Sequence, residues 1–430
     1  MKKLLLPLLL MASALCSAQS PDEVLVPNIA SVQLHLYGDQ LGYPMIRLNS
    51  ADQLELHFDD LDGNVKNYSY TFQLCNADWT PAMLSYFDYI KGYSQMRINT
   101  YRIASIAFTK YTHYQAVIPD RNCYPSRSGN YLLKVFRDGD QNKVIFTRRF
   151  YVLDEMTRVE AFVQQPFNGQ YFRTHQKVQF KLGFNEQLSI VNHLQQVKVI
   201  LLQNNRWDNA LTSIRPTFFS RNQMEFNTEA DCVFPSGKEW RWLDLRSFRL
   251  QSDRVANARY STTSTDIYVK PDMDRSAQRF NFFRDANGQY TIQCMENLNP
   301  YWQGDYATVH FAFVPPDNRE LPGKDIYVFG QLTNYAFNDQ TKMTFVPEDG
   351  AYETKLFLKQ GYYDYTYVTL DRNDSRAKAS YEYTEGNYWE TENNYLLLVY
   401  FRPLAGRADE LVGYKVVNSL TGRQSIGTPR

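Results

Sequence analysis

Residues 54–58 read Leu-Glu-Leu-His-Phe, and residues 59–64 continue Asp-Asp-Leu-Asp-Gly-Asn. Alternation of apolar and polar residues is typical of a β-strand with one buried face, and Asp, Asn and Gly favour turns. Residues 68–74 alternate in the same way. We therefore expect a β-hairpin here. We interpret the acidic cluster at 59–64 as a turn rather than a metal site, because it lacks the residue spacing of a calcium-binding EF-hand loop.

The same strand signal recurs around this hairpin. Residues 111–118, 131–136 and 144–152 alternate or run apolar between turn residues, and we expect six or seven strands in all between 32 and 152. Short strands separated by frequent turns predict a β-sandwich. Residues 80–108 interrupt the pattern, and we expect a long loop with at most one short helix there.

Two further β units are predicted downstream. Residues 197–202 and 395–401 are nearly continuous apolar runs, as buried strands are. Residues 252–279 are polar and turn-rich, so we expect a loop. Further strands are predicted at 311–314, 326–329, 355–358 and 363–368. The predicted order is a signal peptide at 1–18, an N-terminal β-sandwich at 28–155, a second β domain with long loops at 156–316, a third β-sandwich at 320–405 and a C-terminal tail at 406–430. The expected fold class is all-β, with two or three consecutive Ig-like sandwich domains after a cleaved signal peptide.

Composition agrees with a β-rich chain. Aromatic residues make up 15% of the 430 residues, and they suit half-buried pleated strands. Lys plus Arg and Asp plus Glu both number 46, so no strong field attracts nucleic acid or an anionic membrane. We expect no nucleic-acid partner.

The first residues predict export. Lys2 and Lys3 precede a short apolar run, and the small residues at Cys16 and Ala18 fit cleavage before Gln19. A lipoprotein signal at Cys16 is the alternative, which Leu15 disfavours. Four cysteines remain after cleavage, at 75, 123, 232 and 294. We expect buried thiols, with a Cys75–Cys123 disulfide as the alternative because export permits disulfides.

Catalytic and metal motifs are not found in the sequence. It holds no GxSxG, HExxH, GxxxxGK or Rossmann glycine motif, and its six histidines, at 35, 57, 113, 175, 193 and 310, show no ligand spacing. We therefore predict no catalytic residue, no metal site, no cofactor and no small-molecule substrate, and expect that the protein is not an enzyme.

Several segments together resemble the plug protein of the type IX secretion system of Bacteroidota. One departure is Leu74, where the family often has His before the cysteine. The segments that carry the resemblance are 44–50, 54–61, 75–79, 111–114, 128–131, 146–152, 203–208 and 242–247.

The resemblance implies a periplasmic, non-enzymatic protein at the outer-membrane translocon. Such a plug reversibly closes the periplasmic mouth of the large export barrel, so the implied partner is that barrel, and membrane contact occurs only through it. Aromatic and Arg residues are enriched at interfaces. The candidate partner-interface residues are Trp79, Tyr89, Tyr93, Arg148 and Arg149. For Trp79 the competing interpretation is burial under the sandwich, with Asp78 capping the adjacent turn.

The third unit also resembles an early-set Ig-like domain of the kind found in glycogen-binding modules. Residues 328–330, 334–335 and 361–365 carry this likeness, but Tyr335 stands where glucan-binding modules usually have Trp. We interpret the unit as structural or docking. The alternative function is a periplasmic or surface carbohydrate-binding protein.

Overall fold

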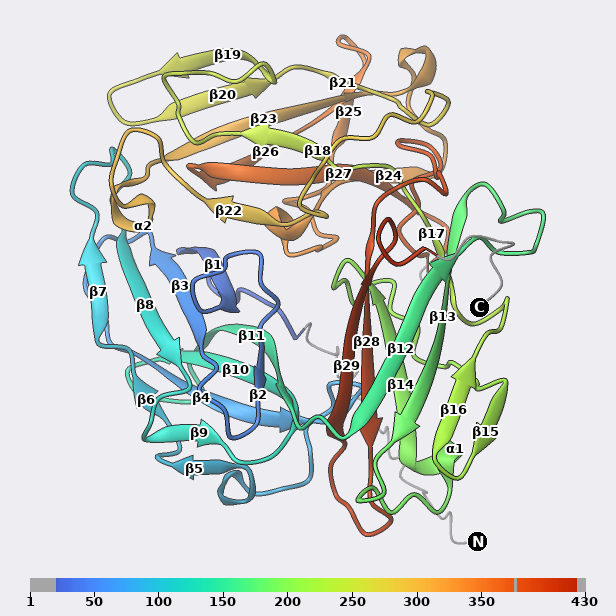
Figure 1. Cartoon of the computed structure of the whole chain (residues 1–430). Helices are drawn as coiled ribbons and strands as arrows, with labels where there is room; N and C mark the ends of the chain where they lie inside the picture. The colour runs from blue at the N-terminus through green and yellow to red at the C-terminus, as the bar shows by residue number, and fades with distance from the viewer. Residues whose placement is uncertain (1–20, 375–376, 424–430) are drawn as a thin grey trace, which may run out of the picture.

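A computed structural model describes residues 21–374 and 377–423 and is all-β. The predicted signal peptide lies outside the described residues, as do the last seven residues of the predicted tail. Three β-sandwiches make up the described chain; Figure 1 shows their arrangement, and side chains of each contact both of the others. The predicted all-β class with several sandwich domains is confirmed, but the sandwiches are not consecutive, because one is inserted within another. Within the described residues, no helix has the length and apolar character that a membrane span requires.

The N-terminal sandwich is built from β1 to β11. Its core contains Leu54, Leu56 and Phe58 from the alternating stretch, which face Phe72 and Phe150 of the other sheet. One sheet has the order β1 (Ile29–Leu36), β3 (Leu54–Asp60), β8 (Thr112–Ile118), β7 (Thr100–Ile103). The other has the order β2 (Met45–Arg47), β11 (Val144–Leu153), β10 (Gly129–Arg137), β4 (Tyr68–Cys75), β6 (Met96–Arg97), and a separate ribbon pairs β5 (Ile90–Gly92) with β9 (Cys123–Pro125) after the short helix η1 (Tyr86–Asp88).

The middle sandwich combines strands from two distant parts of the chain. One sheet has the order β12 (Thr157–Gln164), β13 (His175–Phe184), β16 (Gln223–Phe226), β15 (Phe218–Ser220), with β17 (Val233–Pro235) also on β13. The other has the order β14 (Val197–Gln203), β28 (Asn394–Phe401), β29 (Glu410–Asn418), and α1 (His193–Gln196) precedes β14. In Figure 1 the red strands β28 and β29 lie beside the green strands of this sandwich.

The inserted sandwich lies between these two parts in sequence. One side has β18 (Arg241–Asp244), β27 (Gly361–Asp371) and β22 (Tyr290–Ile292), with β24 (Lys324–Phe329) also on β27. The other has β19 (Val255–Tyr260), β20 (Thr265–Val269), β23 (Tyr306–Val314), β26 (Ala351–Lys359) and β25 (Thr344–Val346), with β21 (Asp272–Met273) on β23. Its short helices are α2 (Pro300–Gln303), η2 (Pro316–Asn318) and η3 (Gln331–Thr333).

These pairings differ from the predicted division into domains. The predicted third domain at 320–405 loses β28, which pairs with β14, and the predicted tail at 406–430 contains the strand β29. The predicted second domain at 156–316 contains strands of two sandwiches, because β18, β22 and β23 pair with strands after residue 320. The predicted loop at 252–279 is wrong as well, since it contains β19, β20 and β21. Many of its strand residues are exposed, which hides the apolar alternation.

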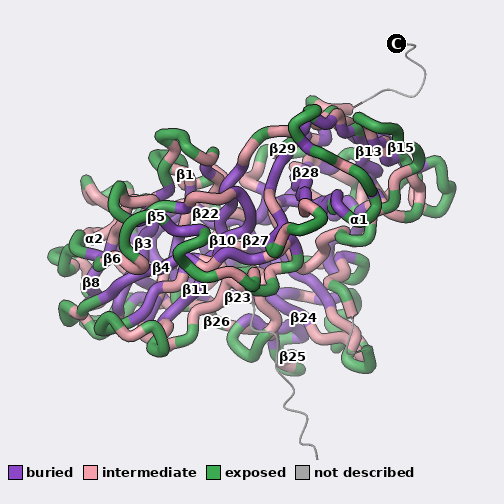
Figure 2. Tube along the Cα trace, turned by 90° about the horizontal axis from the view of Figure 1, so that it is seen from below, coloured by how far each residue is buried: buried purple, intermediate pink, exposed green. Residues whose placement is uncertain are grey.

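The apolar runs at 197–202 and 395–401 have a simple physical reason. Val199 and Leu201 of β14 face the middle core, whereas Ile200 and Leu202 face the N-terminal sandwich. β28 divides its residues between the same two cores. A strand buried on both faces is apolar at every position rather than at alternate ones. Figure 2 shows the result as a buried interior with exposed loops around it.

The four described cysteines, Cys75, Cys123, Cys232 and Cys294, are free. The first three are buried, as predicted, and Cys294 is partly exposed. The Cys75–Cys123 disulfide that export would permit is therefore not formed.

Candidate functional site: an apolar loop surface and a buried polar interface

Residues 80–108, which interrupt the predicted strand pattern, project large apolar side chains into solvent. Met83, Phe87 and Tyr93 are 85%, 75% and 66% exposed, and the Tyr86 ring packs at a tilt against Phe87 with ring centroids 3.9 Å apart. We call Met83, Tyr86, Phe87 and Tyr93 the apolar loop surface. Isolated exposed apolar residues are ordinary, but several on one short loop are typical of an interaction surface.

This loop is anchored to the N-terminal sandwich. Tyr89 and Ile90 are buried in the core of the N-terminal sandwich. The Asp88 carboxylate accepts a hydrogen bond of 2.9 Å from the Ser85 backbone N–H, which closes the turn of η1. Gly92 has a positive φ of 87°, and a Cβ there would lie 2.0 Å from the Asn122 carbonyl oxygen. The surface is therefore presented by an anchored loop rather than a free one.

The structure places the five predicted interface residues in different environments. Tyr93 is exposed and belongs to the apolar loop surface, whereas Tyr89 is one of its buried anchors. Arg148 is buried, and its guanidinium donates to the backbone carbonyls of Thr147 and Val32 and to Asn334 of the inserted sandwich. For Tyr89 and Arg148, burial leaves no side-chain surface for another protein. The alternating pattern of β11 gives no signal of this burial, because it results from contact between sandwiches.

Trp79 and Arg149 lie at the contact between the N-terminal and middle sandwiches. The Arg149 guanidinium sits 5.0 Å from the Trp79 ring and 5.1 Å from the Trp207 ring. The two indoles meet edge to face, 5.3 Å apart, and the Trp207 indole N–H donates to the Tyr151 hydroxyl at 2.9 Å. Trp79 thus packs inside the chain. Asp78 caps the adjacent turn as predicted, because its carboxylate accepts from the Thr80 N–H at 3.1 Å.

A buried polar interface joins the N-terminal and inserted sandwiches. Asp59 of β3 accepts hydrogen bonds from His113 Nδ1 at 2.7 Å and the Tyr306 hydroxyl at 2.6 Å, and it forms an ion pair with Lys359. The Lys359 ammonium also donates to the Tyr301 carbonyl and lies 4.1 Å from the Tyr111 ring. Burial by itself would raise the pKa of the Asp59 carboxyl, but the Lys359 ammonium and the His113 bond hold that pKa below its usual value.

Three histidines stack along the same interface. The ring centroids of His35 and His57 are 5.6 Å apart, and those of His57 and His113 are 5.3 Å apart. Tyr301 of α2 stacks on His57 with a centroid distance of 3.9 Å. Burial, with His113, His35 and Lys359 nearby, lowers the pKa of His57 to about 2, so His57 is neutral. The sequence showed no ligand spacing because β1, β3 and β8 contribute one histidine each. The three histidines lie on the same face of adjacent strands. The sequence signal for this was that each of them occupies a polar position of its alternating strand.

The prediction that residues 59–64 form an acidic turn is correct only in part. Residues 61–64 do form the turn between β3 and β4, but Asp59 and Asp60 belong to β3 and are buried. The Asp60 carboxylate pairs with Lys66 at 2.8 Å and accepts from the Tyr68 hydroxyl at 2.8 Å. These two carboxylates are therefore part of the internal packing.

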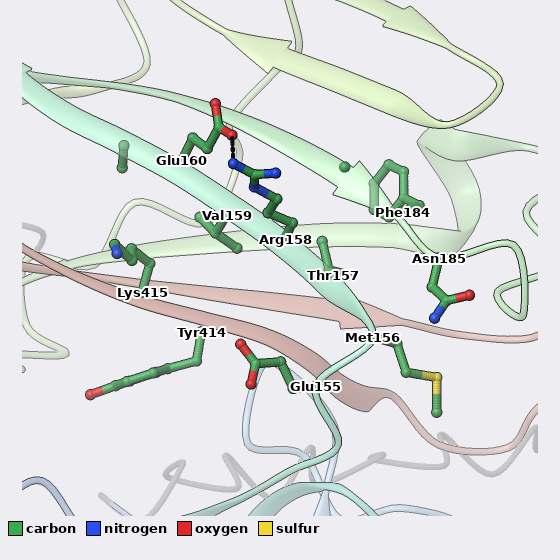
Figure 3. Close-up of a pocket in the computed structure, with 12 residues that line it drawn as sticks. Glu155, Met156, Thr157, Arg158, Val159, Glu160, Phe184, Asn185, Tyr414 and Lys415 are labelled. Atoms are coloured by element: carbon green, nitrogen blue, oxygen red, sulfur yellow. Dashed lines mark ion pairs between the residues drawn. The ribbon is translucent and has the colours of Figure 1, made fainter.

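An open pocket lies on the middle sandwich where β12 meets β29, and Figure 3 shows its lining side chains. Its lining mixes charged and apolar residues, and the exposed Arg158–Glu160 pair, 2.8 Å apart, lies along β12. The lining contains no histidine or cysteine, so it offers no nucleophile with an imidazole base. Tyr335 stands where glucan-binding modules usually have Trp. Its ring packs inside the chain against Trp240 and Phe329, so it is not presented to a sugar.

Comparisons with known proteins identify the N-terminal sandwich. Residues 29–154 match the family described as "Type 9 secretion system plug protein 1st domain", and this range covers β1 to β11. The chain is also similar to the crystal structure of a hypothetical protein from Parabacteroides merdae, with 28% identity, 92% of this chain and 98% of that chain covered, and a TM-score of 0.88. A search of curated proteins finds no match. The N-terminal sandwich therefore matches the first domain of the type 9 secretion system plug protein family.

Proposed function

We propose that this protein is a periplasmic plug that reversibly closes the periplasmic mouth of the outer-membrane translocon barrel of the type IX secretion system. The observation that carries the proposal is the plug first domain at residues 29–154. The family is a component of a secretion system and not an enzyme family. The proposed role accordingly needs no catalytic residue and no cofactor, and its partner is the barrel protein.

The apolar loop surface is the proposed docking element on this plug. It lies on the family domain, it is anchored by Tyr89 and Ile90, and its side chains are of the type that dominates binding energy at interfaces. The formal net charge of the chain is zero, so long-range charge attraction supplies little affinity. Shape and apolar contact should therefore dominate the interaction, and it should depend only weakly on salt.

A plug that gates export must release the barrel. Cargo and plug would compete for the same mouth, so each lowers the apparent affinity of the other by mass action. Barrel purified from cells stalled in export should then carry less plug than barrel from cells without cargo. Deleting the gene should leave export partly working and make the outer membrane permeable to large antibiotics that it normally excludes.

Affinity purification of the tagged protein from its own envelope tests the docking surface. Wild type should recover a very large barrel protein, and a variant with Met83→Ser, Phe87→Ser and Tyr93→Ser should recover at least tenfold less. The control is Phe218→Ser with Phe219→Ser, two apolar residues on β15 of the middle sandwich that are about half exposed. Equal recovery by both variants would contradict the docking surface. Absence of the barrel with wild type, together with retention on a glycan array, would favour the carbohydrate-binding alternative.

A further inference from the structure

Three potential metal ligands converge on the face of the N-terminal sandwich that the inserted sandwich covers. His35 of β1 lies directly opposite Glu55 of β3 in the strand register, and His57 follows Glu55 by two residues on the same face. One imidazole nitrogen from each histidine and one carboxylate oxygen of Glu55 all lie within 4.8 Å of one another. Figure 1 shows β1 and β3 at this face with α2 close to it.

The hydrogen bonds around these histidines determine where their protons sit. Asp59 is ionised beside Lys359 and only accepts, so His113 donates from Nδ1 across 2.7 Å and keeps a lone pair on Nε2. His57 Nδ1 lies 3.1 Å from that Nε2 and must therefore donate to it. The His57 Nε2 atom is then left with its lone pair free.

His35 reaches the same state by a different contact. Its Nδ1 atom lies 2.9 Å from the Leu36 carbonyl oxygen, which only accepts, so Nδ1 carries the proton. The Nε2 atoms of His35 and His57 are both buried and have no hydrogen-bond partner among the described residues. Their side chains are only 3% and 2% exposed. Buried polar atoms of folded proteins are nearly always satisfied, so two unpartnered lone pairs beside a carboxylate require an explanation.

We propose that His35, Glu55 and His57 bind one divalent transition-metal ion, with Zn²⁺ as the best match. Two imidazole nitrogens and a carboxylate oxygen are a recurrent zinc donor set that leaves a fourth position for water. Mg²⁺ and Ca²⁺ prefer oxygen ligands alone. With Zn–N bonds of about 2.0–2.1 Å, tetrahedral ligand atoms lie roughly 3.3 Å apart, so small side-chain rotations close the site.

The surroundings have the features that orient metal ligands. The Asp59–His113–His57 chain holds His57 in the tautomer that presents Nε2, which is how carboxylates position zinc-binding histidines. The Glu55 carboxylate accepts from the Gly38 backbone N–H at 3.1 Å, which leaves further lone pairs for the ion. Tyr301 of α2 covers His57, so a bound ion lies at the contact between the two sandwiches and stabilises it.

Metal titration of the purified full-length protein tests the site. Protein stripped with a chelator is titrated with Zn²⁺ against a chromophoric competitor, and with Co²⁺ for the visible absorption of a tetrahedral site. Wild type should bind one ion at micromolar or lower concentration, without competition from Mg²⁺. Zn²⁺ should also raise the melting temperature of wild type.

Variants locate the ion on these residues. Glu55→Gln changes a partly exposed side chain and should fold, as near-ultraviolet circular dichroism will check, yet bind Zn²⁺ at least about tenfold more weakly. His35→Gln should lose the Co²⁺ spectrum. The control is His310→Gln, whose imidazole contacts Asp266 in the inserted sandwich, and it should bind as wild type does. Failure of wild type to bind, or equal binding by wild type and Glu55→Gln, overturns the proposal. Binding lost only in His310→Gln overturns it as well.

Discussion

Replacing Lys359 by Met should weaken the contact between the N-terminal and inserted sandwiches strongly. The side chains of Lys359 and Asp59 are each only 1% exposed, so the substitution leaves a buried carboxylate without its counter-ion. Breaking a buried pair in this way costs about 3–5 kcal/mol. Protonation of Asp59 limits the loss. At pH 7 it costs about 4 kcal/mol for a carboxyl with an unfolded pKa of about 3.9, which agrees with that range.

Because protonation of Asp59 limits the loss of stability, that loss should depend on pH. In the variant, the folded-state pKa of Asp59 rises above its unfolded value, so the variant binds a proton more readily when folded. Its stability relative to wild type therefore improves as the pH falls. At pH 5 the cost of protonation is only between about 1 and 2 kcal/mol. The loss should thus shrink by more than half between pH 7 and pH 5.

Urea unfolding followed by intrinsic fluorescence measures both effects. The matched control is Lys355→Met on the same strand, β26, where the lysine is exposed and the change should stay within about 0.5 kcal/mol. Adding Asp59→Asn to Lys359→Met should recover part of the loss, because it removes the unpaired charge. A shift no larger than that of the control, or an equal loss at pH 5 and pH 7, would refute the reasoning.

Three further predictions concern other parts of the chain. Trp79→Ala should lower the free energy of unfolding by about 2–4 kcal/mol in thermal melts, because its indole packs between two sandwiches; unchanged stability with lost barrel recovery would instead make Trp79 a docking residue. Burial raises the pKa of Asp364 to about 8 and that of Asp285 to about 7, so the stability they contribute is full below pH 4 and is lost as the pH rises towards 8. Asp364→Asn should flatten the fall in wild-type stability between pH 5 and 8, and an identical pH profile would contradict this assignment. Gly92→Ala should cost at least about 2 kcal/mol and make the loop sensitive to protease, because its Cβ would meet the Asn122 carbonyl; a protease pattern like wild type would contradict this clash.

Much of the candidate site could not be read from residue types. Tyr93 was predicted as an interface residue and is exposed, but Trp79, Arg148 and Arg149 contact other parts of the same chain. Aromatic and Arg residues favour interfaces of every kind, and sequence does not distinguish an interface between domains from one between proteins. Met83 and Phe87 were missed because an exposed apolar residue in a loop looks the same in sequence as a buried one.

The sequence by itself determined the fold class and the strands that carry a strong period. Residues 54–58 alternate because one face meets a core, and residues 197–202 and 395–401 are apolar throughout because both faces do. Only the tertiary structure decided that β28 pairs with β14, that a sandwich is inserted between them, and that His35, Glu55 and His57 meet. The physical reason is that burial leaves a local pattern in each strand, whereas the identity of its neighbour depends on packing between segments far apart in the chain.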